Sequence, residues 1–367
     1  MAFNLDDFLL KSQQANASDV HLHCNRQPSL RIKGDIYKIS SNPLTYEDIV
    51  AILKQTLPAE FNKDISTIKD IDYIYEIKDR ARFRVNYCKD LNHGKFTFRN
   101  IPYKIKTLEE LKLPEYLREY TKLNNGIIFV TGATGSGKST TLSSLIEIIN
   151  QTRKEHIITI EDPVEFIYEE KKAIITQRSL KIDVSDFKSG IKYALRQDPD
   201  VILVGEIRDR QTLLSAIEAS ETGHLVFSTL HTNGTIQSLN RLIGFIDENS
   251  QMDFLKRISQ CIRGVIHQQL VPTVNKGELT PALEILTFTS TVMDYAKDGK
   301  WEEIYALMQK SRQKNLVTMN SSLYELYQKN IITKETALEY SLEKIEMEQM
   351  IRGMSYGSMD EDEEDIL

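Results

Sequence analysis

The chain has 367 residues, 41% of them hydrophobic and 27% charged, which is the composition of an ordinary soluble protein with two or three domains. Its formal charge of −7 comes mostly from residues 360–365, an acidic run that carries six negative charges and leaves −1 for the rest. The nearly neutral remainder argues against a dedicated nucleic-acid binder, and the three widely spaced cysteines argue against a disulfide framework or a zinc site.

The sequence contains no segment typical of membrane insertion. No apolar run approaches the roughly 20 residues that a helix needs to span a bilayer. The first ten residues include Asp6 and Asp7 and lack the basic start of a signal peptide. We therefore expect a cytoplasmic protein.

Residues 1–101 predict an α+β domain. Helical apolar spacing covers residues 5–14, and Thr45 is placed to cap a second helix that ends near Pro58. Strands are predicted at residues 19–24, 29–39 with a turn at Gly34-Asp35, 71–77, 80–87 and 95–101. The polar stretch 102–125, which contains two prolines, is interpreted as a linker.

Four apolar runs rich in β-branched residues follow, at residues 127–130, 157–160, 201–204 and 225–230. Such runs, separated by segments of helix length, predict buried strands of a parallel sheet whose carboxyl ends line one crevice. Each run ends in a residue able to take part in phosphate chemistry. We therefore expect a nucleotide site within an α/β domain at residues 126–290.

The first run leads into a complete phosphate-loop motif, Gly132-x-x-x-x-Gly-Lys-Ser, placed between a strand and a helix beginning near Ser139. In such a loop the glycines let backbone N–H groups converge on phosphate, Lys138 offers a positive charge, and Ser139 can ligate Mg²⁺. The candidate nucleotide-binding residues are Gly132, Thr134, Gly135, Ser136, Gly137, Lys138, Ser139 and Thr140. The sequence has no guanine-reading Asn-Lys-x-Asp motif, which favours ATP over GTP.

Two carboxylates end the next two strands. Glu206 stands where hydrolysis needs a carboxylate that reaches the metal's water shell or activates water, so it is a candidate catalytic and Mg²⁺-binding residue. Glu161 has the equivalent place one strand earlier and is a candidate for positioning water or for the metal shell. For the adjacent Asp162 the alternative is that an Asp-Pro pair only starts a turn.

Two histidines flank the last run. His231 follows it and is a candidate catalytic residue that contacts the γ-phosphate, the alternative being a histidine that only caps the strand. His224 lies at the start of this strand and on its opposite face, so we assign it a structural role.

Helices are expected between and after these strands. One begins at Ser185 and stops before Pro199, and another is capped by Asp209 and runs through Glu221. Further on, a long helix is predicted from residue 251 to about 269, an edge strand at 282–286, and amphipathic helices at 301–314 and 320–328.

The end of the chain divides into a helical region at residues 291–350 and a disordered acidic tail at residues 351–367. Such a tail is either merely solvated or an interaction segment.

Four motifs therefore occur in order: the phosphate loop at residues 131–141, an acidic box at 157–168, a Walker B region at 196–209 and a histidine box at 222–233. With residues 17–22 and 82–86, they resemble the secretion and pilus motor ATPases, specifically the PilT/PilU-type retraction ATPases of type IV pili. The C-terminal region is the part that this resemblance covers least.

The resemblance implies a PAS-like α+β N-terminal domain followed by a RecA-like P-loop ATPase domain with a helical C-terminal region, assembled as a homohexamer. In such rings an N-terminal domain supplies arginines to bound ATP, and Arg84 and Arg99 match the family's candidate fingers, with Arg82 as the alternative. Arginines that alternate on an exposed strand can also form only a solvated face.

The same resemblance implies a hexameric motor at the cytoplasmic side of the pilus base that hydrolyses ATP to retract pili, the basis of twitching motility. Its expected partners are an inner-membrane pilus platform protein and a paralogous retraction ATPase, and no direct nucleic acid is expected. The chain lacks the cysteine quartet and the long N-terminal extension of assembly ATPases, which favours the retraction subgroup.

One segment departs from the retraction motors, which carry Ala-Ile-Arg-Asn-Leu-Ile shortly before a Gly-Lys pair. Here residues 291–296 are Thr-Val-Met-Asp-Tyr-Ala, so Met293 takes the place of the arginine. Three alternatives therefore stay open: an accessory, PilU-like motor subunit, a pilus or type II secretion assembly ATPase, and a nucleic-acid translocase.

Overall fold

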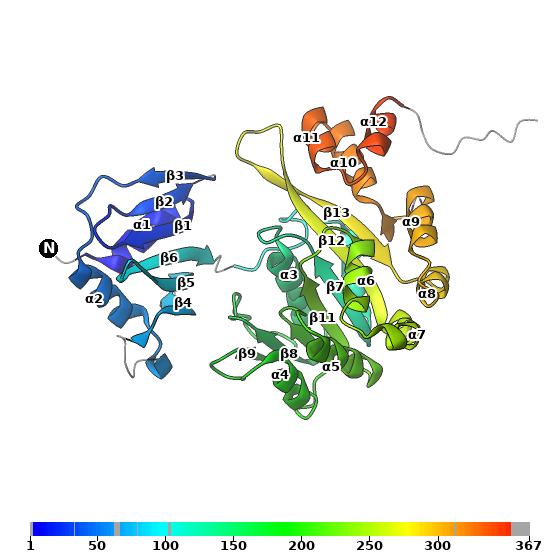
Figure 1. Cartoon of the computed structure of the whole chain (residues 1–367), viewed down its shortest axis with the longest axis horizontal. Helices are drawn as coiled ribbons and strands as arrows, with labels where there is room; N and C mark the ends of the chain where they lie inside the picture. Colours follow the sequence, from blue (N-terminus) through cyan, green and yellow to red (C-terminus); the bar gives the residue numbers. More distant parts are fainter. Residues whose placement is uncertain are drawn as a thin grey trace, which may run out of the picture. The chain divides into compact units, whose positions relative to one another are not determined.

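The computed structural model describes residues 3–32, 34–61, 67–78, 80–101, 104–311 and 313–353 (Figure 1). The predicted acidic tail therefore lies outside the described residues from residue 354 onward. The chain divides into two compact units. The first comprises Met1–Ile105, Thr159–Glu170 and Ile175–Gly190, and the second comprises Lys106–Ile158, Lys171–Ile174 and the chain from Ile191 onward.

The first unit contains an antiparallel sheet of six strands in the order β3-β2-β1-β6-β5-β4 (Figure 1). Its elements are α1 Leu5–Gln14, β1 Ala17–His23, β2 Ser29–Ile32, β3 Asp35–Lys38, α2 Tyr46–Thr56, η1 Ala59–Phe61, β4 Asp70–Ile77, β5 Ala81–Asp90 and β6 His93–Ile101. Alternate residues of β5 and β6 are buried, among them Phe83, Phe96 and Phe98. This period of two fits a sheet with one face against a core. The predicted helices and strands of this region are confirmed.

A second sheet has eight strands in the order β14-β13-β12-β7-β11-β10-β8-β9. These are β7 Gly126–Thr131, β8 His156–Glu161, β9 Ile174–Ser179, β10 Val201–Val204, β11 Leu225–Leu230, β12 Ile262–Pro272, β13 Leu279–Thr287 and β14 Leu316–Val317. Strands β7, β11 and β10 are parallel and fully buried. The four strands predicted from apolar runs are therefore present.

Helices connect and follow these strands (Figure 1). They are η3 Glu115–Lys122, α3 Lys138–Thr152, α4 Phe187–Ala194, α5 Arg210–Glu221, α6 Thr235–Ile243, η4 Glu248–Ser250, α7 Gln251–Cys261, α8 Ser290–Ala296, α9 Trp301–Lys310, α10 Met319–Gln328, α11 Lys334–Tyr340 and α12 Lys344–Ile351. As predicted, the Asp209 side chain accepts a hydrogen bond from the Thr212 backbone N–H and so caps α5. In the described part of the chain no helix is long and apolar enough for a membrane span.

The predicted long helix from residue 251 to about 269 is wrong in its second half. The helix ends at Cys261, and the chain continues as β12, which pairs in parallel with β7 and in antiparallel with β13. An apolar run such as Val265-Ile266 satisfies a buried strand and a buried helix equally well, so periodicity could not separate them. The strand predicted at residues 282–286 is present as part of β13, but its position at the edge of the sheet is wrong, because β13 lies between β12 and β14.

The segment interpreted as a linker is folded over much of its length. Residues 106–125 lie in the second unit and contain η3, in which Leu117 and Tyr120 are buried. These two apolar side chains lie three residues apart and so face the same way in a 3₁₀ helix, which polarity alone did not reveal.

Candidate active site

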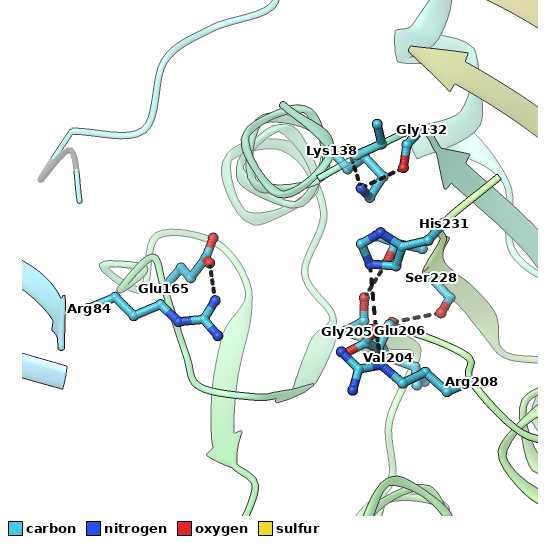
Figure 2. Close-up of polar contacts among 12 residues, drawn as sticks. Arg84, Gly132, Lys138, Glu165, Val204, Gly205, Glu206, Arg208, Ser228 and His231 are labelled. Carbon is cyan, nitrogen blue, oxygen red and sulfur yellow. Dashed lines mark hydrogen bonds and ion pairs between the residues drawn. The ribbon is translucent and has the colours of Figure 1, made fainter. Parts of the chain in front are cut away.

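The phosphate loop joins the end of β7 to the start of α3, as the motif predicts. The ammonium group of Lys138 is buried and donates hydrogen bonds of 2.9 Å to the carbonyl oxygens of both Gly132 and Ala133 (Figure 2). The side chain thus curls back over its own loop. The charge lies where phosphates of a bound nucleotide would meet the N-terminus of a helix.

Glycine is required at two positions of the loop. Gly132 has φ +145°, and a Cβ there would lie 2.4 Å from the backbone oxygen of Gln268. Gly137 has φ +88°, and its Cβ would lie 2.8 Å from the Gln268 side chain. Both the backbone conformation and the close approach of β12 therefore exclude larger residues.

Glu206 follows β10 and is held through its neighbours. The hydroxyl of Thr229 on β11 donates to the Gly205 carbonyl (2.7 Å), and the Thr229 carbonyl accepts from the Ile207 N–H (3.1 Å). Ser228, also on β11, donates to the Val204 carbonyl (2.8 Å; Figure 2). The backbone on both sides of Glu206 is therefore fixed by one neighbouring strand.

The Glu206 carboxylate has two side-chain partners. Arg208 Nε donates to Glu206 Oε2 at 2.5 Å, and His231 Nε2 lies 3.5 Å from the same oxygen (Figure 2). Burial and then the charge of Lys138 lower the pKa of His231, while Glu206 opposes this shift. Near pH 7 the imidazole is therefore largely neutral and can donate or accept a hydrogen bond. Glu206 and His231, chosen separately from the sequence, lie together.

A cavity of about 510 Å³ opens beside this cluster, lined by Thr134, Ile207, Arg208, Leu230, His231 and Arg241. Thr134 and His231 were predicted site residues, whereas Arg208 and Arg241 were missed. Arg241 lies on α6 with its guanidinium 4.7 Å from the centre of the Phe245 ring. The sequence cannot distinguish an arginine of an amphipathic helix that lines a site from one that only faces solvent.

Glu161 ends β8, the strand next to β10 in the sheet order. Burial raises the pKa of its carboxyl group to about 7, and the nearby Glu165 adds to the rise. Its Oε1 atom is buried without a hydrogen-bond partner among the described residues. Glu161 therefore titrates in the neutral range.

The candidate fingers lie on adjacent strands of the first unit. Arg84 on β5 and Arg99 on β6 are direct cross-strand partners. Arg84 Nη1 lies 3.4 Å from Glu165 Oε1 (Figure 2), and Arg99 Nε donates to Asp19 Oδ1 at 2.9 Å. The alternative, Arg82, is buried and donates to the Glu165 backbone oxygen at 3.1 Å.

The remaining candidates are placed by local geometry. Ser139 lies in the first turn of α3, which begins at Lys138, and is exposed, as are Thr134 and Gly135. His224 Nδ1 lies 2.8 Å from the Ala219 carbonyl oxygen and 3.1 Å from the Thr222 hydroxyl, at the end of α5. The His224 ring is therefore held against the C-terminal end of α5.

The donor set suits Mg²⁺, although no group of three or more His, Cys, Asp or Glu side chains in the described residues could hold a metal ion. Mg²⁺ keeps several waters and takes only one or two protein ligands beside the phosphates. The Ser139 hydroxyl and the Glu206 carboxylate would supply that many oxygens.

Comparison with known proteins places this chain in a family. The family model described as type II/IV secretion system protein matches residues 78–351. The type IV pilus retraction ATPase PilT of Pseudomonas aeruginosa is 34% identical, over 92% of this chain and 97% of its own. The type IV pilus ATPase PilU of the same organism is 32% identical, over 92% of this chain and 89% of its own.

A solved structure agrees with these matches. The crystal structure of the pilus retraction motor PilT with bound ADP superposes with a TM-score of 0.87 and 34% identity, covering 95% of this chain and all of that one. The α/β fold of this chain is therefore that of a nucleotide-binding motor ATPase.

Proposed function

The chain belongs to the type II/IV secretion system protein family, and we propose that this ATPase couples ATP hydrolysis to the retraction of type IV pili and so to twitching motility. The observation that carries the proposal is the cluster of Lys138, Glu206 and His231 at the strand ends, in a chain similar to PilT along nearly its whole length. A complete phosphate loop with an intact lysine and a carboxylate opposite it supports turnover rather than binding alone.

In this proposal, ATP binding changes the hydrogen-bond partners of Lys138 in the phosphate loop. Lys138 leaves the carbonyls of Gly132 and Ala133 for the terminal phosphates, and the loop's backbone N–H groups surround them. Ser139 and Glu206 would hold Mg²⁺, which neutralises charge on the phosphates. Glu206 or Glu161 orients and deprotonates the attacking water, and His231 donates to the γ-phosphate.

We further propose that the unit acting is a homohexamer of PAS-like and RecA-like domains at the cytoplasmic side of the inner membrane. Arg84 and Arg99 then act as fingers on ATP bound by a neighbouring subunit. Support comes from the TM-score of 0.87 with the PilT structure and from the position of both arginines on one sheet face. A membrane platform protein and a paralogous ATPase are the proposed partners.

A second candidate function is an accessory motor. Met293, in place of the expected arginine, is partly buried in α8, and PilU matches this chain nearly as well as PilT does. An accessory subunit would hydrolyse ATP but depend on a second ATPase to retract pili. An assembly ATPase is the remaining alternative.

Deleting the gene and imaging pili tests these functions. Hyperpiliated cells without retraction support a retraction motor, whereas bald cells identify an assembly ATPase and contradict the proposal. Expressing the chain alone in cells that lack every other retraction ATPase then separates the two retraction functions. Restored retraction identifies a primary motor; failure with normal ATPase activity identifies an accessory one.

A further inference from the structure

The phosphate loop has a close neighbour that the motif does not include. Strand β12 runs parallel to β7, with Val265, Ile266 and His267 opposite Phe129, Val130 and Thr131. The next residue, Gln268, therefore reaches the level at which β7 ends and the loop begins. Gln268 is 3% exposed.

Both polar atoms of the Gln268 side-chain amide form hydrogen bonds, one with the phosphate loop and one with α3. Nε2 donates to the Ser136 carbonyl oxygen at 2.7 Å, and Oε1 accepts from the Thr141 hydroxyl at 2.7 Å. A carbonyl can only accept, so the amino group must face Ser136 and the oxygen must face Thr141. The side chain thus joins the middle of the loop to the first turns of α3.

This contact sets the direction of a backbone donor. The carbonyl of Ser136 and the N–H of Gly137 belong to one planar trans peptide, in which they point in opposite directions. With the carbonyl bound to Gln268, the Gly137 N–H is turned away from β12. The amide also fills the space that a side chain at Gly137 would need, since a Cβ there would lie 2.8 Å from Nε2.

We propose that Gln268 is a positioning residue of the ATPase site, which holds the Ser136–Gly137 peptide with its N–H directed at the phosphates of ATP. Gln268 itself does not touch the nucleotide. An anion site of backbone N–H groups depends on their orientation before binding, because each peptide that must rotate reduces affinity. This inference rests on the proposed role of the phosphate loop.

The main test is nucleotide affinity, measured by titrating the full-length protein with a fluorescent ATP analogue and Mg²⁺. Gln268→Leu has similar volume but removes both hydrogen bonds, and we expect a roughly 5- to 50-fold rise in Kd. Gln268→Glu keeps an acceptor for Thr141 but places a carboxylate oxygen against the Ser136 carbonyl, so it should also weaken binding. If Gln268→Leu fails to fold, Gln268→Glu carries the test.

A matched control is available on the same strand. Gln269 contacts His267 at 3.3 Å rather than the loop, so Gln269→Leu should change Kd less than about twofold. A mere loss of strand stability would affect both variants. Equal losses of affinity in Gln268→Leu and Gln269→Leu would therefore overturn the proposal.

A double-mutant cycle separates positioning from general destabilisation. Thr141→Val removes the donor that holds Gln268, so it should weaken ATP binding in the wild-type background but add little to Gln268→Leu. Fully additive effects contradict the shared contact.

The phosphate-loop role is tested independently by Lys138→Ala, with Lys154→Ala as its control beyond the other end of α3. We expect Lys138→Ala to abolish tight binding. If it does so while both Gln268 variants bind normally, only the inference about Gln268 fails. Normal binding by Lys138→Ala would instead remove the phosphate-loop proposal and this inference with it.

Discussion

Two side chains contact the same carboxylate oxygen of Glu206. Arg208 contacts Oε2 at 2.5 Å, while His231 approaches the same oxygen at 3.5 Å with a lowered pKa. Because both contacts hold the same oxygen, they restrict the orientation of the carboxylate to which the proposal assigns the attacking water.

Glu206→Gln should retain ATP but lose at least about 100-fold in turnover, because the shape is kept and only the carboxylate is removed. Phosphate release and binding of a fluorescent ATP analogue measure the two properties separately. Glu218→Gln, on the exposed side of α5, is the matched control and should behave as wild type. Near-normal turnover in Glu206→Gln would move the catalytic role to Glu161.

Glu161 gives a prediction about stability and pH. Its pKa is raised from 4.5 to about 7 by burial, so the unfolded chain releases this proton at lower pH than the folded chain does. Ionisation therefore opposes folding, with no cost below about pH 4 and the full cost above pH 7. Glu161→Gln should raise stability by up to about 3 kcal/mol at pH 8 and leave it unchanged at pH 4. Thermal unfolding of both proteins at the two pH values measures this, and an equal gain at both would refute the burial argument.

Single residues were the part of the site that the sequence revealed best. Lys138 was predicted from the phosphate-loop motif, and Glu206 and His231 from their places after strands; the structure places the last two 3.5 Å apart. Arg208, Arg241 and Gln268 were not found, since each requires knowing which way a side chain faces. For Gln268 the error had a cause, because the residue was assigned to a helix.

At the scale of elements, β11 fixes the backbone around Glu206 at the end of the neighbouring strand β10. Its Ser228 and Thr229 bind the backbone of residues 204–207, so the carboxylate of Glu206 is placed by hydrogen bonds that it does not itself make. The apolar character of this strand was evident from the sequence. The sequence did not show which groups the hydroxyls of Ser228 and Thr229 bind, because these contacts depend on β10 lying directly beside β11.

Thr229→Val should lower turnover by roughly 3- to 10-fold with little change in nucleotide affinity, because the Gly205 carbonyl loses its hydroxyl donor. Thr229→Ser keeps the hydroxyl and should restore most of the activity. Steady-state ATPase assays with parallel binding titrations measure both effects. Normal turnover in Thr229→Val would show that the hydrogen bond to the Gly205 carbonyl is not needed to place Glu206.

For the whole molecule, the predicted elements follow the chain order of the first unit, but in the second unit β12 was predicted as a helix and the start of the unit was misplaced. The polar segment before β7 was assigned to a linker, whereas η3 buries Leu117 and Tyr120 in the second unit. Short 3₁₀ helices bury few residues and so leave a weak periodic signal. The homohexamer is inferred from the family resemblance, because the sequence of one chain does not specify how many copies assemble or with which symmetry.

The candidate finger arginines allow the proposed homohexamer to be tested. Arg84 pairs with Glu165 of its own chain, which permits a purely structural role as well as action on a neighbour's ATP. If Arg84 serves a neighbour, rings of Arg84→Ala and rings of Lys138→Ala are each inactive, but mixed rings are not. Random mixing leaves about one interface in four with both halves intact, because each ring interface joins two different surfaces.

We therefore expect an equal mixture of the Arg84→Ala and Lys138→Ala proteins to regain up to about a quarter of wild-type ATPase activity. The control mixes Arg84→Ala with the Arg84→Ala/Lys138→Ala double variant, in which no interface has an intact arginine. A structural ion pair predicts instead that Arg84→Ala lowers the unfolding temperature and that mixing restores nothing. Mixed rings that demonstrably form and stay inactive would show that Arg84 acts within its own chain.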